Sequence, residues 1–176
     1  IATFNGLDRL DETTGKFIHY RNDPNNPNSL SDNWVWPLYE DSRGFLWIGT
    51  VRGGLNRLDP MTNTFVHYKN DPNDPASISD NFIFSVYKDR SGLIWIGTNL
   101  NGINYFNPST QAFEHYKHKP ENKNSLSDDV VFSMLADGNG NYWIETKDGG
   151  LNKFDNSNEL CLKQANSLKD LEKAFA

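Results

Sequence analysis

The chain has little cysteine, no excess of positive charge and no long apolar run. Its single cysteine, Cys161, excludes an internal disulfide or a cysteine-based zinc site, and it is most simply a small apolar residue in a strand. The 17 basic and 23 acidic residues give a net charge of -6 with no basic stripe, which argues against nucleic acid as a partner. Without about 18 consecutive apolar residues or a signal-peptide pattern, we expect no membrane contact by this segment.

Helical periodicity is also missing, and a long repeat takes its place. Residues 33–80 align without a gap to residues 81–128, with 20 identities in 48 positions. The most regular part of the repeat contains a tryptophan in each copy, at Trp47, Trp95 and Trp143. A fixed period of this size is typical of solenoids, propellers or arrays.

Each repeat contains four apolar segments of strand length separated by turn signals. In residues 81–128 we predict strands at Phe82 to Lys88, Leu93 to Thr98, Gly102 to Phe106 and Ala112 to Lys117. The first segment of each copy is apolar on both faces, which indicates sheets that are covered on both sides. The sequence therefore predicts an all-β fold of β-propeller blades, each with four antiparallel strands.

Two turn signals recur within the predicted blades. Asp-x-x-Gly separates the first two strands, beginning at Asp41, Asp89 and Asp137, and it predicts a hairpin whose glycine has a positive φ. Gly or Asn begins the turn between the second and third strands, at Asn5, Gly53, Asn101 and Gly149, where we also expect a left-handed backbone.

The predicted blades divide the chain unevenly. They comprise a partial blade at 1–32, full blades at 33–80 and 81–128, a degenerate blade at 129–165 and a tail at 166–176. In the tail, Leu168, Leu171 and Phe175 have helical spacing, which favours a short helix over an early inter-blade connection. About three to four blades make a partial propeller. It could close as a four-bladed ring, pair with a second chain as a homodimer, or be part of a longer chain, which we favour.

One order of segments occupies residues 37–59 and recurs in related form at 85–107 and 133–155. It consists of the inner strand, the Asp-x-x-Gly turn, the Leu-Trp-Ile-Gly-Thr segment and Gly-Gly-Leu-Asn-Arg-Leu-Asp. This order resembles the two-component regulator propeller repeat. The resemblance implies a periplasmic sensor portion of a bacterial membrane-bound hybrid histidine kinase. It also implies recognition of glycan-derived oligosaccharides, with the remaining blades and downstream sensor domains as partners.

Residues that repeat are expected to be architectural, and function is sought where the copies differ. His19, His67 and His115 occupy equivalent outer strands and should not converge on a metal ion. Large aromatic side chains and variable polar residues are expected around one end of the blades, where they could bind a sugar. The candidate ligand-binding residues are Asn33, Trp34, Trp36, Arg52, Asn81, Asn99 and Asn101. The alternative is that the tryptophans fill the core and the polar residues are solvated loop tips.

No catalytic constellation, metal site or cofactor is predicted, so we expect a binding module rather than an enzyme. Two alternatives stay open at the sequence level. One is a structural segment that packs against other blades or a partner. The other is a lyase-like enzyme similar to the streptogramin lyase propellers, for which His118, outside the repeated histidine position, is a candidate residue.

Overall fold

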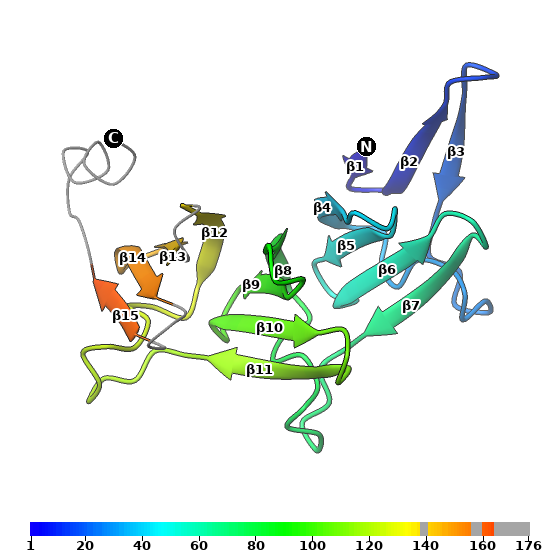
Figure 1. Ribbon diagram of the computed structural model, residues 1–176. Coiled ribbons are helices and arrows are strands. Elements are labelled where there is room, and N and C mark those ends of the chain that lie inside the picture. The colour runs from blue at the N-terminus through cyan, green and yellow to red at the C-terminus, as the bar shows by residue number, and fades with distance from the viewer. Residues whose placement is uncertain (138–140, 156–159, 164–176) are drawn as a thin grey trace.

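A computed structural model describes residues 1–137, 141–155 and 160–163, and its strands form four antiparallel sheets in chain order (Figure 1). Blade 1 contains β1 (Ala2–Thr3), β2 (Gly6–Asp11) and β3 (Lys16–Tyr20). Blade 2 contains β4 (Val35–Glu40), β5 (Leu46–Thr50), β6 (Leu55–Asp59) and β7 (Thr64–Tyr68). Blade 3 contains β8 (Ile83–Lys88), β9 (Ile94–Thr98), β10 (Ile103–Asn107) and β11 (Ala112–Tyr116). Blade 4 contains β12 (Val131–Ala136), β13 (Asn141–Thr146), β14 (Gly150–Asp155) and β15 (Leu160–Lys163). The predicted all-β architecture of partial-propeller blades is confirmed.

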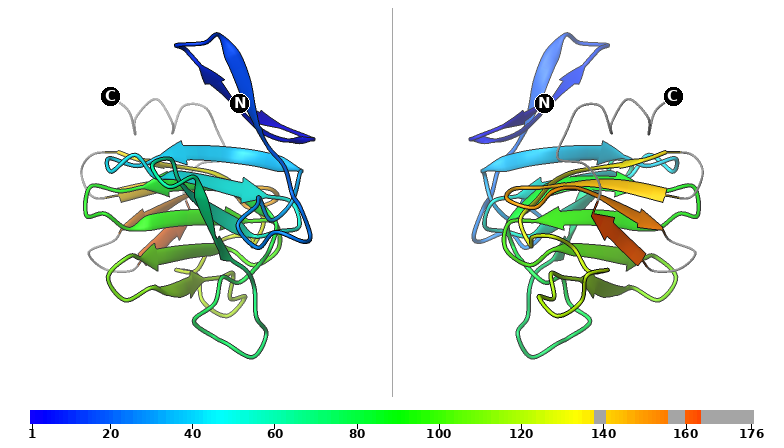
Figure 2. Two further views of the ribbon diagram at one scale, coloured as in Figure 1. Left: turned by 90° about the vertical axis from the view of Figure 1, so that its right-hand side faces the viewer. Right: turned by 90° about the vertical axis from the view of Figure 1, so that its left-hand side faces the viewer.

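The blades follow one another along an arc, with blade 1 and blade 4 at its two ends (Figure 1). Seen from its sides, the three four-stranded sheets lie roughly one behind another, and blade 1 projects beyond them (Figure 2). The four predicted strands of residues 81–128 agree with β8 to β11 to within one residue at each end. The degenerate repeat still forms a fourth strand, β15, which includes Cys161. The tail at 166–176, with its predicted helix, lies outside the described residues.

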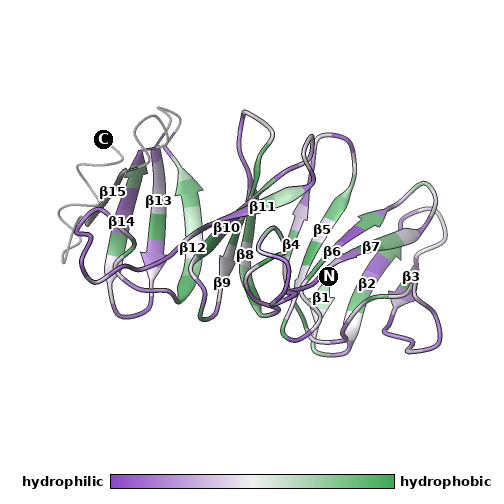
Figure 3. Cartoon of the chain, turned by 90° about the horizontal axis from the view of Figure 1, so that it is seen from below, coloured by the Kyte–Doolittle hydropathy of each residue, from purple (hydrophilic) through white to green (hydrophobic). Residues whose placement is uncertain are grey.

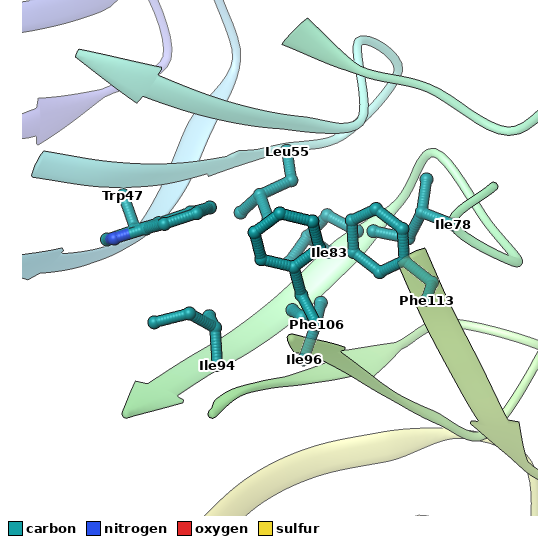
Figure 4. Close-up of a cluster of buried hydrophobic side chains, with 8 residues drawn as sticks. All are labelled: Trp47, Leu55, Ile78, Ile83, Ile94, Ile96, Phe106 and Phe113. Atoms are coloured by element: carbon teal, nitrogen blue, oxygen red, sulfur yellow. The ribbon is translucent and has the colours of Figure 1, made fainter. Parts of the chain in front are cut away.

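The core lies between the blades rather than inside any one sheet, because each sheet is one layer thick. Hydrophobic residues concentrate in the strands, and the connecting loops are largely hydrophilic (Figure 3). The cluster between blades 2 and 3 joins residues of both sheets, and Figure 4 shows their side chains meeting: Trp47, Leu55, Ile78, Ile83, Ile94, Ile96, Phe106 and Phe113. Trp95 has the same place between blades 3 and 4. The repeated Trp47 and Trp95 are therefore packing residues, as predicted.

Buried polar residues fix the loop that enters each blade. Asn56, Asn104 and Asn152 are fully buried on the third strands. Each bonds the backbone N–H and the hydroxyl of a serine 25 residues earlier, at Ser31, Ser79 and Ser127, over 2.7 to 3.0 Å. Because unpaired buried amides are costly, this pair fixes the entry loop relative to the sheet.

The predicted left-handed turn between the second and third strands is displaced by one residue. The positive φ values belong to the following glycines, Gly6, Gly54, Gly102 and Gly150, and not to Asn5, Gly53, Asn101 or Gly149. Gly53 and Gly149 are small for another reason, since a Cβ there would collide with Ser31 or Ser127 of the entry loop. The prediction therefore confused close approach with a left-handed backbone. The hairpin glycines Gly44 and Gly92 do have positive φ, as expected.

A stability prediction arises at the hairpins between the third and fourth strands. The same position has φ of 69° at Gly15, 59° at Asn63 and 57° at Gln111. A side chain in this region costs about 1–2 kcal/mol, which exceeds the flexibility cost of glycine. Gln111→Gly is therefore expected to raise the free energy of unfolding by about 0.5–1 kcal/mol, measured by urea unfolding. A Gln111→Ala variant as stable as the glycine variant would contradict this explanation.

Candidate functional site

The inner strands and the loops between the second and third strands meet at one end of the blades, which we call the loop face. Backbone N–H groups of Val51, Asn99 and Lys147 donate to the carbonyls of Trp34, Phe82 and Val130, at 3.0 to 3.1 Å. A side-chain carboxylate reinforces each connection: Asp32 accepts from Arg52 N, Asp80 from Leu100 N and Asp128 from Asp148 N, at 2.8 to 3.2 Å. The loop face is thus built by the same bonds in blades 2, 3 and 4.

The constant framework presents different side chains in successive blades. The residue whose backbone N–H donates to this carboxylate differs from blade to blade. It is Arg52 in blade 2, Leu100 in blade 3 and Asp148 in blade 4. All three residues are exposed. The burial of Asp128 would raise its pKa, but the N–H groups of Asp148 and Val130 outweigh that effect and lower it. The three carboxylates hold the loops, while the neighbouring side chains are free to vary.

Exposed and half-buried aromatic rings lie beside these loops on the inner strands. Trp36, Phe84 and Phe132 occupy the same position of β4, β8 and β12, and we call them the aromatic row. Ring centroids are 5.8 Å apart for Trp36 and Phe84 and 5.2 Å apart for Phe84 and Phe132, with interplanar angles of 89° and 88°. Trp36 is 48% exposed and Phe132 is 40% exposed. The row therefore offers both ring faces and ring edges to a ligand.

Trp34 extends the aromatic surface toward blade 1. It is 38% exposed and meets Phe4 edge-on, with centroids 5.4 Å apart. In blade 3 the equivalent residue is Phe82, which packs against Phe84 at 4.6 Å. The interpretation of Trp34 and Trp36 as core-filling residues is not supported, because both side chains are exposed on the loop face.

The predicted polar residues divide into two groups. Asn33 and Asn81 accept hydrogen bonds from the backbone of Asn22 and Asn70, at 2.7 and 2.9 Å. Asn101 accepts from Lys117 Nζ at 2.9 Å and donates to Asp80 at 3.3 Å. These three amides hold the loops in place, whereas Arg52 is exposed and Asn99 is partly exposed. The structure thus places all seven candidate residues at the loop face, and Trp34, Trp36 and Arg52 are the most accessible of them.

The repeated histidines and carboxylates have architectural partners. His67 and His115 donate through Nε2 to the carbonyls of Ser29 and Ser77, at 2.8 and 2.9 Å. His19 is 2.8 Å from Asp8 in blade 1. In the part of the chain that the structure describes, no group of three or more His, Cys, Asp or Glu side chains could hold a metal ion.

The histidine considered as an enzymatic residue also has a structural partner. His118 donates through Nδ1 to the carbonyl of Leu126 at 2.6 Å. Asn22 and Asn70 make the same bond at the equivalent positions, to the carbonyls of Leu30 and Ile78. His118 therefore occupies the position of a loop-closing asparagine.

The aspartates of the Asp-x-x-Gly turns hold the tryptophans as well as the turns. Asp41 and Asp89 each accept from a tryptophan indole N–H, of Trp47 at 3.3 Å and of Trp95 at 2.8 Å. Burial would raise the pKa of Asp89, but hydrogen bonds from Ser91, Trp95 and Tyr142 outweigh it and lower the pKa. Burial and the Asp89 carboxylate both raise the pKa of the Tyr142 hydroxyl. The predicted turn residues are thus confirmed as structural.

Two members of the aromatic surface were missed at the sequence level. Phe84 and Phe132 repeat with Trp36 at intervals of 48 residues, and repetition favoured an architectural role for them. Their exposure depends on the irregular pairing of the inner strands, whose register shifts between Ile83 and Ser85 and between Val131 and Ser133. The signal that could have identified Phe84 and Phe132 was their place at successive 48-residue intervals from Trp36, which was already a candidate.

Comparison with known proteins agrees with this architecture. Residues 29–52 and 77–100 match the family model of the two component regulator propeller. The extracellular domain of the hybrid two component system BT3049 of B. thetaiotaomicron superposes with a TM-score of 0.83 at 24% identity, over 96% of this chain and 23% of that chain. The corresponding domain of BT4673 from the same organism gives a TM-score of 0.73 at 27% identity, over 90% of this chain and 22% of that chain. The chain thus spans less than a quarter of the length of either domain.

A third similar structure is that of an enzyme. Virginiamycin B lyase from Staphylococcus aureus superposes with a TM-score of 0.62 at 16% identity, over 89% of this chain and 47% of that chain, which shows a shared fold alone. The search of curated proteins gave no significant match. Among the described residues, no helix is both long and apolar enough to cross a membrane.

Proposed function

We propose that this segment, which carries two-component regulator propeller repeats, belongs to the periplasmic sensor of a hybrid histidine kinase. We also propose that it binds an oligosaccharide at its loop face. The similarity to extracellular domains of two hybrid two component systems supports the sensory context. The exposed aromatic row beside variable loop tips carries the proposal for the ligand.

The chemistry of the loop face suits a sugar. Pyranose rings have apolar C–H faces that stack on aromatic rings, and their hydroxyls exchange hydrogen bonds with amides and charged groups. Trp34 and Trp36 supply the stacking surfaces, while Arg52 and Asn99 supply polar groups at the same end of the blades. Asn33, Asn81 and Asn101 keep the loops fixed, which lowers the entropic cost of binding. The arrangement favours binding over catalysis.

Signal relay requires that the ligand prefer one arrangement of the sensor over another. The loop face meets that condition, because a ligand of several sugar units would contact more than one blade. Contact across blades 2, 3 and 4 would favour one relative placement of the blades. We therefore propose that occupancy of the loop face is transmitted through the neighbouring sensor domains to a cytoplasmic kinase.

Calorimetric titration of the full chain with a panel of oligosaccharides tests the ligand proposal. At least one member is expected to bind with an affinity above that of its constituent monosaccharide, because a longer glycan reaches more of the aromatic row. Absence of binding by every oligosaccharide would contradict the carbohydrate proposal. Analysis of the mixtures for cleaved product after long incubation separates a binding module from a lyase.

Trp36→Ala is expected to weaken the identified oligosaccharide about tenfold, on the order of 1.4 kcal/mol, because it removes the most exposed stacking surface. Trp34→Ala is expected to have a similar but smaller effect, since Trp34 already contacts Phe4. Met61→Ala is the matched control: Met61 is 91% exposed in the hairpin between β6 and β7, away from the loop face. An affinity unchanged in Trp36→Ala, with the fold intact, would remove Trp36 from the site.

A further inference from the structure

The interface between blades 3 and 4 contains a cavity of about 200 Å³ at the outer side of the sheets. Its floor is apolar and largely aromatic, formed by Trp95, Tyr116, Leu126 and Phe154. Tyr116 and Phe154 are in ring contact with centroids 4.9 Å apart. Polar residues of the loop between β11 and β12 form its rim, among them Lys117 and Lys119. The cavity lies outside the loop face and is formed by different residues.

The equivalent place between blades 2 and 3 is filled by a phenyl ring. Phe113 of β11 lies there, 5.6 Å from Tyr68 and 4.8 Å from Phe106 between ring centroids. Figure 4 shows Phe113 beside Phe106 and Ile78 in this cluster. Phe113 is 5% exposed, so one aromatic ring closes this interface against solvent. The molecule itself thus shows which chemical group fits at this position of a blade interface.

The strand register shows why blade 4 differs. Phe113 pairs with Phe106 across β10 and β11, and Phe65 pairs with Leu58 across β6 and β7. At the same register position of blade 4, Cys161 pairs with Phe154. A residue with a much smaller side chain therefore stands where the other full blades have phenylalanine. At this register position blade 4 therefore has no phenyl ring.

A second departure from the repeat occurs at the rim of the same cavity. Asp23 and Asp71 occupy one position of the inter-blade loop in the earlier copies, and Lys119 occupies it in this one. The backbone is unchanged, because Lys119 N donates to Ser125 Oγ as Asp71 N donates to Ser77 Oγ, both at 2.9 Å. The substitution thus changes the charge of the rim from negative to positive and leaves the loop in place.

A second lysine and a histidine lie at the same rim. Lys117 lies beside Lys119, with its Nζ bonded to Asn101 Oδ1 at 2.9 Å. His115 donates to the Ser77 carbonyl. The described residues that line the cavity include no aspartate or glutamate. The rim therefore favours an anion above an apolar floor.

We propose that this interface cavity binds a small aromatic carboxylate, with its ring in the place that Phe113 has in the preceding interface and its carboxylate at Lys119. A cavity of about 150 Å³ lined by apolar side chains accommodates benzene, so one ring fits the volume observed here. The floor supplies ring contacts with Trp95, Tyr116 and Phe154, and Lys119 supplies a charge-assisted hydrogen bond. This site is independent of the oligosaccharide site proposed at the loop face.

Phenylacetate and the uncharged benzyl alcohol are suitable probes, titrated into the full chain and followed by ligand-observed NMR. Phenylacetate is expected to bind with the higher affinity. Cys161→Phe restores the ring of the other blades and is expected to weaken both probes more than about tenfold. Lys119→Asp restores the residue of the earlier copies and is expected to weaken phenylacetate about tenfold, with benzyl alcohol changed less than about twofold.

Cys161→Leu is a smaller filling variant for use if Cys161→Phe does not fold, and it is also expected to weaken both probes. Lys123→Asp makes the same charge change in the same loop, at a residue outside the cavity lining, and is expected to leave both affinities unchanged. The proposal is overturned if phenylacetate does not bind. It is equally overturned if a folded filling variant binds phenylacetate as tightly as the unchanged chain. Neither outcome bears on oligosaccharide binding.

Discussion

Trp95→Ala is expected to lower the free energy of unfolding by about 3–5 kcal/mol, the range for truncation of a buried large aromatic side chain. Trp95 is 1% exposed and makes ring contacts with Tyr105, Tyr116, Tyr142 and Phe154. Two of these partners belong to blade 3 and two to blade 4. The substitution therefore removes packing within one blade and between two, and leaves Asp89 without its indole donor.

Urea unfolding followed by circular dichroism measures this loss. Trp36→Ala is the comparison, because Trp36 is 48% exposed and its truncation is expected to cost less than about 1 kcal/mol. The two tryptophans thus separate the architectural role from the surface role within one residue type. Equal destabilisation by the two substitutions would contradict the assignment of Trp95 to the core and Trp36 to the loop face.

Asp89→Asn is expected to cost about 2–3 kcal/mol, because it replaces a buried acceptor of four hydrogen bonds. Asp89 Oδ1 accepts from Ser91 Oγ and Leu93 N, and Oδ2 accepts from Trp95 Nε1 and Tyr142 OH. An amide has one acceptor oxygen, so either Leu93 N or Trp95 Nε1 loses its acceptor, and the hydroxyl beside it must turn to accept from the amide NH2. The bond from Tyr142 crosses between blades 3 and 4, so the loss affects their interface.

Asp41→Asn makes the same change one blade earlier and is expected to cost less. Asp41 accepts from Trp47 Nε1 at 3.3 Å, which is longer than the 2.8 Å bond from Trp95 Nε1 to Asp89. The residue of blade 3 equivalent to Tyr142 is Ile94, which has no hydroxyl to donate. The free energies of unfolding of the two variants, measured side by side, check the contribution of the tyrosine. A loss in Asp41→Asn as large as that in Asp89→Asn would contradict it.

The pH dependence of stability follows from the same carboxylate. The pKa of Asp89 is lowered in the folded state, so its stabilising contribution is fully present above the unfolded pKa of about 3.9. That contribution is lost as the pH falls below this value and through the lower folded pKa. Unfolding measured between about pH 5 and pH 2 should therefore show a weaker loss of stability for Asp89→Asn than for the unchanged chain.

The fold was predictable from the sequence because its determinants are local and repeated. Asp-x-x-Gly, the Trp47 and Trp95 segments and the apolar inner strands each specify a turn or strand that recurs at 48 residues. The displaced left-handed turn shows the limit of this reasoning. Gly53 and Gly54 are the same residue type, and only the position of Ser31 in three dimensions shows which glycine avoids a collision and which has the positive φ.

The site was predicted less completely, for a related reason. The variable residues Trp34, Trp36 and Arg52 were found because they differ between copies. Phe84 and Phe132 were not, because a repeated aromatic residue can be buried or exposed and the repeat alone does not distinguish these cases. The hydrogen bonds that commit Asn33 and Asn81 to the loops depend on partners 11 residues away in folded connections. These contacts became visible only in the structure.

The central claim is that the shared repeat builds the blades and that the aromatic residues exposed at the loop face bind the ligand. Calorimetric titration of Trp36→Phe with the oligosaccharide found in the panel tests it most directly, because this change gives blade 2 the residue of blades 3 and 4. Trp36→Phe is expected to bind with an affinity about three- to tenfold lower than that of the unchanged chain, with the free energy of unfolding unaltered. An affinity equal to that of the unchanged chain would contradict it.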